Sequence, residues 1–166
     1  PFHMWLAELE EKAGKYISIF TQNVDSLHQA AGSTQVTEMH GNSRELYCLP
    51  FKNRGCGLII SASLTEIIDI PICPSCGNNL KPNMALFGEA ITGFEEARKQ
   101  ILASDLLIVA GTALNVFPVR DLPLVASSRE IPIPSLWINP SLPPAEFNFT
   151  YEQILTSDDF AALARL

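Results

Sequence analysis

The stretch Leu-Leu-Ile-Val-Ala-Gly-Thr at residues 106–112 decides the fold class of this chain. Five apolar residues in a row, without alternation, are typical of a strand that is buried on both faces of a sheet. The Gly-Thr pair that follows predicts a tight polar turn at the carboxyl end of this strand. A strand buried on both faces needs helices above and below it, so the stretch favours a parallel α/β sheet.

Two further apolar runs are expected to be strands of the same sheet. Residues 16–20 lead into a polar run that contains Asn23, and residues 135–138 lead into Asn139. We expect these strands and the first to be parallel and adjacent, with Asn23, Thr112 and Asn139 at one edge. Ligands of open parallel sheets bind outside the carboxyl ends of the strands, so a polar crevice suited to a dinucleotide is predicted there.

Helical spacing of apolar residues and weaker apolar runs predict the remaining elements. The expected helices cover residues 2–13, 25–31, 94–102, 118–127 and 159–166, and the weaker strands cover 44–48 and 84–87. Strands that alternate with helices in this way are typical of a parallel sheet covered on both faces.

Composition excludes several classes of protein. Of the 166 residues, 47% are hydrophobic and 17% are charged, so the chain can bury a core and differs from disordered segments. The formal net charge of -7 disfavours a surface that grips nucleic-acid phosphates. No apolar run approaches the roughly 20 residues that span a bilayer. We therefore expect no direct binding to nucleic acid and no membrane partner.

The four cysteines lie within 29 residues, at Cys48, Cys56, Cys73 and Cys76. The sequence Cys-Pro-Ser-Cys-Gly at 73–77 is typical of a zinc knuckle, because two thiolates three residues apart reach one ion. Four thiolates leave no open position on zinc, so we predict a structural ion and a reducing compartment inside the cell. The alternative is four unrelated buried thiols, and the seven residues between Cys48 and Cys56 are more than the usual two to four.

Three polar residues carry candidate chemistry. Asn23 and Asp25 follow a predicted strand, where they either contact a ligand or form a turn and a helix cap. His40 precedes a glycine in a predicted loop, and histidine is the side chain best suited to general-base catalysis near neutral pH. Taken alone, a histidine beside a glycine in a loop is more often an ordinary surface residue than a catalytic one. We interpret His3 and His28, which lie in predicted helices, as structural residues.

The order of the motifs is more specific than any one of them. Along the chain come Thr-Gln-Asn-Val-Asp (21–25), Ser-Leu-His-Gln-Ala-Ala-Gly (26–32), His-Gly (40–41), the four cysteines, Leu-Phe-Gly-Glu (86–89), Ala-Gly-Thr-Ala-Leu-x-Val (110–116) and Ile-Asn-Pro (138–140). This order resembles the sirtuin family, from Phe2 to the last predicted helix.

The resemblance implies an α/β fold made of a Rossmann-like parallel sheet with helices on both faces and a small inserted zinc-binding module. The NAD-binding domain would comprise residues 1–46 and 81–166, and the zinc module residues 47–80. NAD⁺ and an acyl-lysine peptide would meet in the cleft between the two.

The resemblance also assigns roles to individual residues. Asn23 and His40 would be catalytic, with His40 as the general base that takes a proton from a ribose hydroxyl. The predicted contacts to the cofactor are Gln22, Asn23, Asp25, Gly111, Thr112, Ala113, Asn139 and Asp158. The acyl-lysine peptide would join Leu86, Phe87, Gly88 and Glu89 as an added strand, facing Val116 and Phe117.

The implied activity is the NAD⁺-dependent removal of acyl groups from protein lysine side chains. NAD⁺ is consumed as a co-substrate, and nicotinamide and O-acyl-ADP-ribose are released. The implied partner is an acylated, lysine-containing protein or peptide, with histones among the candidate substrates. Structural zinc is the second implied cofactor.

The sequence departs from the family pattern in three places. The interval between Cys48 and Cys56 is long, and Ala113 stands where the family usually has serine. Family members begin with a strand and a Gly-Ala-Gly loop that holds the pyrophosphate at a helix N-terminus. The sequence starts at Pro1, after those elements, so we expect this sheet to lack the first strand and the phosphate loop.

Two alternatives to a deacylase remain open. The chain could be a catalytically impaired scaffold that is stabilised by zinc and binds peptides through residues 86–89. It could also be an ADP-ribosyl transferase or hydrolase on the same fold. The presence of Asn23, Asp25 and His40 favours an enzyme, because a scaffold has no need of all three.

Overall fold

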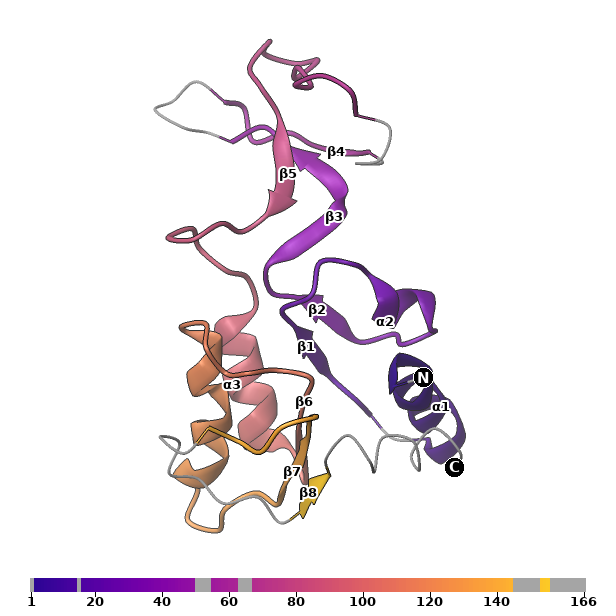
Figure 1. The fold of residues 1–166 in the computed structure, drawn as a ribbon, viewed down its shortest axis with the longest axis vertical. Coiled ribbons are helices and arrows are strands. Elements are labelled where there is room, and N and C mark those ends of the chain that lie inside the picture. The colour runs from indigo at the N-terminus through magenta and orange to yellow at the C-terminus, as the bar shows by residue number, and fades with distance from the viewer. Residues whose placement is uncertain (1, 15, 50–54, 63–66, 145–152, 156–166) are drawn as a thin grey trace. The chain divides into compact units, whose positions relative to one another are not determined.

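The computed structural model describes residues 2–14, 16–49, 55–62, 67–144 and 153–155 (Figure 1). Contacts divide the chain into two compact units. Unit 1 comprises Pro1–Ser18 and Phe94–Leu166, and unit 2 is the continuous segment Ile19–Gly93. Among the described residues, no helix combines the length and the apolar character that a membrane crossing requires.

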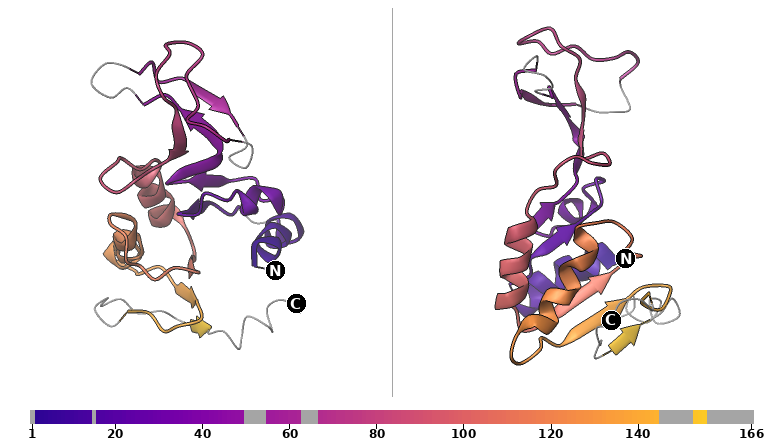
Figure 2. Two further views of the ribbon diagram at one scale, coloured as in Figure 1. Left: turned by 45° about the horizontal axis from the view of Figure 1, so that its top comes forward. Right: turned by 90° about the vertical axis from the view of Figure 1, so that its left-hand side faces the viewer.

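Unit 1 contains a parallel sheet with the strand order β6-β7-β8. Its strands are β6 (Leu107–Ala110), β7 (Ser135–Ile138) and β8 (Gln153–Leu155), and its helices are α1 (Phe2–Ala13), α3 (Phe94–Ala103) and the 3₁₀ helix η3 (Val119–Ser128). The helices α3 and η3 lie side by side (Figure 2). Burial of Val109, Leu114 and Trp137 in one cluster fixes the turn after β6 against the sheet.

Unit 2 contains two small sheets. In the first, β1 (Ile19–Thr21) and β2 (Val36–Glu38) are parallel, and α2 (Leu27–Ala30) lies between them in sequence. In the second, β3 (Gly41–Tyr47) is the central strand between β4 (Ile59–Ser61) and β5 (Lys81–Met84), and both pairings are antiparallel. A cluster of Leu46, Cys48, Cys73 and Leu80 forms the buried core beside this second sheet.

Several sequence expectations are confirmed. The helix expected at 2–13 is α1, and Gly14 follows it with a φ of 58°, in the left-handed region that glycine favours at a helix end. The strand expected at 135–138 is β7, and it pairs in parallel with β6. The helix expected at 118–127 is η3, a 3₁₀ helix with Pro123 inside it.

The expectation that the three apolar runs form adjacent strands is wrong for the described residues. The strand β1 pairs with β2, whereas β6 pairs with β7, so the three apolar runs are not adjacent strands. The partner of β1 is the next strand along the chain, since the short α2 connection brings Val36–Glu38 beside it. That strand is polar and half-buried, so a search for apolar runs does not find it.

The strand expected at 84–87 is displaced. The strand β5 ends at Met84, and Leu86 and Phe87 lie beyond it with exposed side chains. Pro82 lies inside β5, and β5 is an edge strand of its sheet, which is one of the positions where strands accommodate proline. The helix expected at 159–166 lies outside the described residues. The boundaries 1–46, 47–80 and 81–166 stay a prediction.

Candidate functional site

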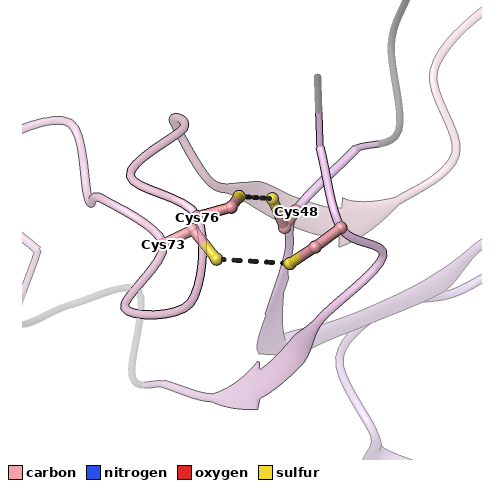
Figure 3. Close-up of side chains that lie close together, drawn as sticks. Cys48, Cys73 and Cys76 are labelled. Carbon is pink, nitrogen blue, oxygen red and sulfur yellow. Dashed lines mark hydrogen bonds between the residues drawn. The ribbon is translucent and has the colours of Figure 1, made fainter. Parts of the chain in front are cut away.

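The four cysteines form one cluster in unit 2. Their Sγ atoms all lie within 4.8 Å of one another, with 3.4 Å between Cys48 and Cys76 and 3.6 Å between Cys56 and Cys73 (Figure 3). Tetrahedral zinc with Zn–S bonds of about 2.3 Å places its thiolates about 3.8 Å apart, whereas a disulfide needs about 2.05 Å. The cluster therefore fits one shared ion, and the long interval between Cys48 and Cys56 does not prevent it.

Backbone hydrogen bonds shape the knuckle that carries Cys73 and Cys76. The N–H of Gly77 donates to the carbonyl of Cys73 at 2.9 Å, and the N–H of Cys73 donates to the carbonyl of Asn78 at 2.7 Å. Gly77 has a φ of 73°, which glycine adopts without strain. The side-chain amide of Asn78 also donates to Cys76 Sγ at 3.2 Å. The sequence therefore folds locally into a loop that turns both sulfurs inward.

Burial and hydrogen bonds shift the pKa values of Cys48 and Cys76 in opposite directions. A backbone hydrogen bond from Cys56 lowers the pKa of Cys48, but burial and hydrogen bonds with the other three thiols raise it to about 12. The backbone N–H of Asn78 lowers the pKa of Cys76 to about 6. Four thiolates this close repel one another, so only a shared positive ion lets all four lose their protons.

The predicted nicotinamide loop follows β1, and the predicted base lies beside it. The ring Nδ1 of His40 lies 3.2 Å from the carbonyl oxygen of Gln22. A carbonyl only accepts, so this contact assigns the proton to Nδ1 and leaves the lone pair of neutral imidazole on Nε2. The N–H of Asn23 donates to Thr21 Oγ1 at 3.1 Å, and Asp25 Oδ1 accepts from the N–H of Leu27 at 3.0 Å.

A network of three side chains holds the end of this loop. Ser26 has a φ of 60°, an uncommon value for a residue other than glycine. Its hydroxyl donates to Glu38 at 2.8 Å and accepts from Arg44 at 2.6 Å, and Arg44 also contacts Glu38 at 2.6 Å. Sequence reasoning missed these residues, because no motif or spacing rule links positions 26, 38 and 44.

A second missed cluster lies on β3 and β5, the strands next to His40. Glu45 on β3 accepts hydrogen bonds from Asn42 at 3.1 Å and from Asn83 on β5 at 2.7 Å. The amides of Asn83 and Asn42 hold the pKa of Glu45 below its ordinary value. Gly41, next to the base, has a φ of 75°, and a Cβ there would lie 1.9 Å from the carbonyl oxygen of Asn83. The backbone beside His40 is therefore closely packed and requires glycine.

The predicted peptide-binding residues lie in both units. Leu86, Phe87, Gly88 and Glu89 form a turn in unit 2, beyond the end of β5. The exposed fractions of Leu86 and Phe87 are 64% and 101%. Val116 and Phe117 are exposed in unit 1, where the guanidinium of Arg120 lies 4.5 Å from the centre of the Phe117 ring.

Unit 1 brings most of the remaining predicted cofactor contacts together. Gly111, Thr112 and Ala113 form the turn after β6, and Gly111 has a φ of 60°. The side chain of Asn139, at the end of β7, donates to the carbonyl oxygen of Thr112 at 2.8 Å. The expectation that Thr112 and Asn139 share one edge is confirmed. Asp158 lies outside the described residues.

The predicted site residues thus form two groups. Gln22, Asn23, Asp25 and His40 belong to unit 2, and Gly111, Thr112, Ala113 and Asn139 belong to unit 1. That the two groups join in one cleft, and that each residue has its assigned role, stays a prediction.

Comparisons with known proteins identify relatives over most of the chain. The Sir2 family pattern matches residues 1–118. An NAD-dependent protein deacetylase of Bacillus anthracis is 38% identical over 151 residues, which cover 90% of this chain and 59% of that protein. An NAD-dependent protein deacetylase of Sulfolobus acidocaldarius is 42% identical over 123 residues, or 74% of this chain and 48% of that protein.

Solved structures give the same result. A structure described as Sir2 with a p53 peptide and NAD⁺ has a TM-score of 0.82 and 32% identity, and the match covers 98% of this chain and 66% of that one. A structure of Sir2 bound to an acetylated peptide has a TM-score of 0.83 and 31% identity, covering 98% and 67%. The chain spans about three-fifths of the Bacillus relative. From the family match, the shared fold and the motif order, the chain belongs to the Sir2 family, the sirtuins.

Proposed function

We propose that this chain carries the catalytic base and the zinc-binding module of an NAD⁺-dependent protein-lysine deacylase. The observation that supports this most directly is the contact of His40 Nδ1 with the carbonyl of Gln22, which leaves Nε2 available as a base. The contact joins the two motifs, 21–25 and 40–41, that the chemistry needs together.

The residues of the chain would act on the reacting groups in two ways. His40 Nε2 accepts the proton of a ribose hydroxyl, so that the sugar oxygen can attack the acyl group. Asn23 and Asp25 hold the nicotinamide end by hydrogen bonds and orient it for departure. NAD⁺ supplies the ribose carbon to which the acyl oxygen becomes bonded as nicotinamide leaves. Water completes the reaction, which yields free lysine and O-acyl-ADP-ribose.

The proposed partners follow from the same chemistry. The substrate is an acylated lysine side chain in a protein or peptide, and a histone tail is one candidate. The peptide lies along the exposed turn at 86–89, where the apolar side chains of Leu86 and Phe87 face solvent. Zinc serves the fold of unit 2 and takes no part in the reaction. Four cysteines able to share zinc suit a reducing compartment, which we propose as the place of action.

A deacylation assay tests the proposal. The zinc-loaded chain, and a version extended to the length of its curated relatives, are incubated with NAD⁺ and an acetyl-lysine peptide. We expect equal amounts of nicotinamide and deacylated peptide, and no product without NAD⁺. His40→Ala should lower turnover by at least about a hundredfold, as loss of a general base does. His3→Ala in α1 is the matched control and should leave turnover unchanged.

The outcomes separate the candidate functions. Undiminished turnover by His40→Ala would overturn the base assignment. Peptide binding without nicotinamide release, in both versions, would favour the scaffold. Transfer of ADP-ribose to protein without deacylation would favour the transferase.

A further inference from the structure

The segment after β5 forms a closed turn. The N–H of Glu89 donates to the carbonyl oxygen of Leu86 at 2.9 Å, and the N–H of Leu86 donates to the carboxylate of Glu89 at 2.9 Å. Gly88 has a φ of 84°, so it supplies the left-handed conformation that the turn needs at its third position. Both backbone groups of Leu86 are therefore engaged within the turn.

A lysine from β5 contacts the segment before this turn and the last residue of the turn. Lys81 Nζ lies 2.5 Å from Glu89 Oε2 and donates to the carbonyl oxygen of Met84 at 3.0 Å. The two charged side chains are only 23% and 31% exposed, so water screens their attraction less than at an open surface. Lys81 also holds the pKa of Glu89 below its ordinary value, together with the Leu86 N–H. We call Lys81 and Glu89 the clasp.

The clasp holds residues that face solvent. Phe87 is fully exposed and Leu86 is largely exposed, although both are apolar. Packing in a hydrophobic core does not explain why Leu86 and Phe87 are held in one conformation, because their side chains are exposed. Apolar side chains displayed on an ordered turn are typical of a binding surface, and ordering them in advance lowers the entropy cost of binding.

The turn is also connected to the proposed base. The N–H of Ala85 donates to the carbonyl oxygen of His40 at 2.9 Å, and Met84 pairs with Gly41 in the β3–β5 ladder. Residues 84–89 therefore connect the backbone of His40 to the exposed turn, and the ion pair of Lys81 with Glu89 holds the end of this segment.

We propose that Lys81 and Glu89 are positioning residues, which hold residues 84–89 in the conformation that receives the acyl-lysine peptide. This inference rests on the proposed function, because it assigns the turn to the peptide. The clasp acts on binding and leaves the chemical step to His40. Its loss should therefore change the KM for peptide and not kcat.

Steady-state kinetics of the version extended to the length of the curated relatives test this role. Lys81→Met keeps the aliphatic stem and removes the charge, and the KM for an acetyl-lysine peptide should rise about tenfold, the equivalent of about 1.4 kcal/mol. The value of kcat should stay within about twofold, and Lys81→Arg, which keeps the charge, should restore most of the affinity. Lys12→Met breaks the exposed ion pair of Lys12 with Glu8 on α1, and it serves as the matched control.

Amide hydrogen exchange gives a readout that does not depend on turnover. In the peptide-free chain, the amides of Leu86 and Glu89 should be protected, and Lys81→Met should speed their exchange about tenfold. Far-ultraviolet circular dichroism and zinc content verify that each variant is folded. Unchanged exchange in Lys81→Met would overturn the clasp itself.

The possible failures are distinguishable. If the unaltered chain binds the peptide and Lys81→Met binds it equally well, the positioning role is overturned alone. If the unaltered chain shows no saturation with peptide while the exchange result holds, the peptide function is overturned, and with it this use of the clasp.

Discussion

The side-chain amide of Asn139 donates a hydrogen bond to the carbonyl oxygen of Thr112 at 2.8 Å. Asn139 follows β7, and Thr112 lies in the turn after β6, so this bond joins the carboxyl ends of two neighbouring parallel strands. The turn that contains Gly111, Thr112 and Ala113 is fixed further, because the hydroxyl of Thr112 accepts from the N–H of Leu114 at 3.1 Å. The two predicted cofactor contacts are thus held by one another.

Asn139→Ala should weaken the binding of NAD⁺ by about tenfold. The turn at 111–113 loses the hydrogen bond from Asn139, and the cofactor loses a contact with the side-chain amide of Asn139. Isothermal titration calorimetry on the version extended to the length of the curated relatives measures the change. Asn79→Ala, an exposed asparagine of unit 2, is the matched control. Equal affinity in the two variants would remove Asn139 from the cofactor site.

Gly41→Ala should destabilise the chain more than an ordinary substitution at a positive φ. Gly14 has a φ of 58°, and no atom lies within 4 Å of the position that a Cβ would take, so Gly14→Ala costs about 1–2 kcal/mol for backbone strain alone. Gly41→Ala adds a contact of 1.9 Å with the carbonyl oxygen of Asn83. Urea unfolding compares the two variants, and equal losses would show that no close approach exists at Gly41.

Removal of zinc should unfold the core of unit 2 around Leu46 and Leu80, because Cys48 and Cys73 belong to the same buried cluster. We expect one zinc per chain by elemental analysis, and loss of near-ultraviolet circular dichroism with a chelator. Cys56→Ser should lower zinc affinity, since it removes one of four ligands. A well-folded chain with far less than one zinc would contradict the metal assignment.

The contribution of Glu45 to stability should depend on pH. Hydrogen bonds from Asn83 and Asn42 lower its pKa in the folded state below the ordinary 4.5. A lowered acid pKa adds stability that is complete above the ordinary value and is lost as the pH falls through the folded value. Urea unfolding at pH 7 and near pH 3 should therefore show a cost of Glu45→Gln that shrinks in acid. A constant cost would show that the hydrogen bonds do not favour the carboxylate.

Much of the fold follows from local signals. The apolar runs in β6 and β7 and the helical spacing of α1 are properties of short segments, so the sequence predicts them well. The strand β2 is half-buried and polar, and β5 contains Pro82, so neither carries the usual signature of a strand. The pairing of β1 with β2 depends on which strand is nearest along the chain, and this does not follow from apolar character.

The candidate site also combines features that the sequence predicts with features that it does not. The four cysteines indicate a metal site because their chemistry and spacing are specific, and their sulfurs do converge. The contact of Asn83 with Glu45 joins residues 38 positions apart, and the clasp joins Lys81 to a carboxylate eight positions away. The first contact forms only when β3 and β5 pair, and the second only when the turn after β5 folds back. Asparagine, glutamate and lysine are common residue types, so their presence at these positions predicts neither contact.

The division of the chain into units has a consequence for its biosynthesis. Unit 2 is one continuous segment, whereas the two parts of unit 1 are separated by all of it. On the ribosome, domains fold as units and the first complete one folds first. Residues 19–93 are translated before β6 and β7, so unit 2 can take up its metal while much of unit 1 is not yet translated.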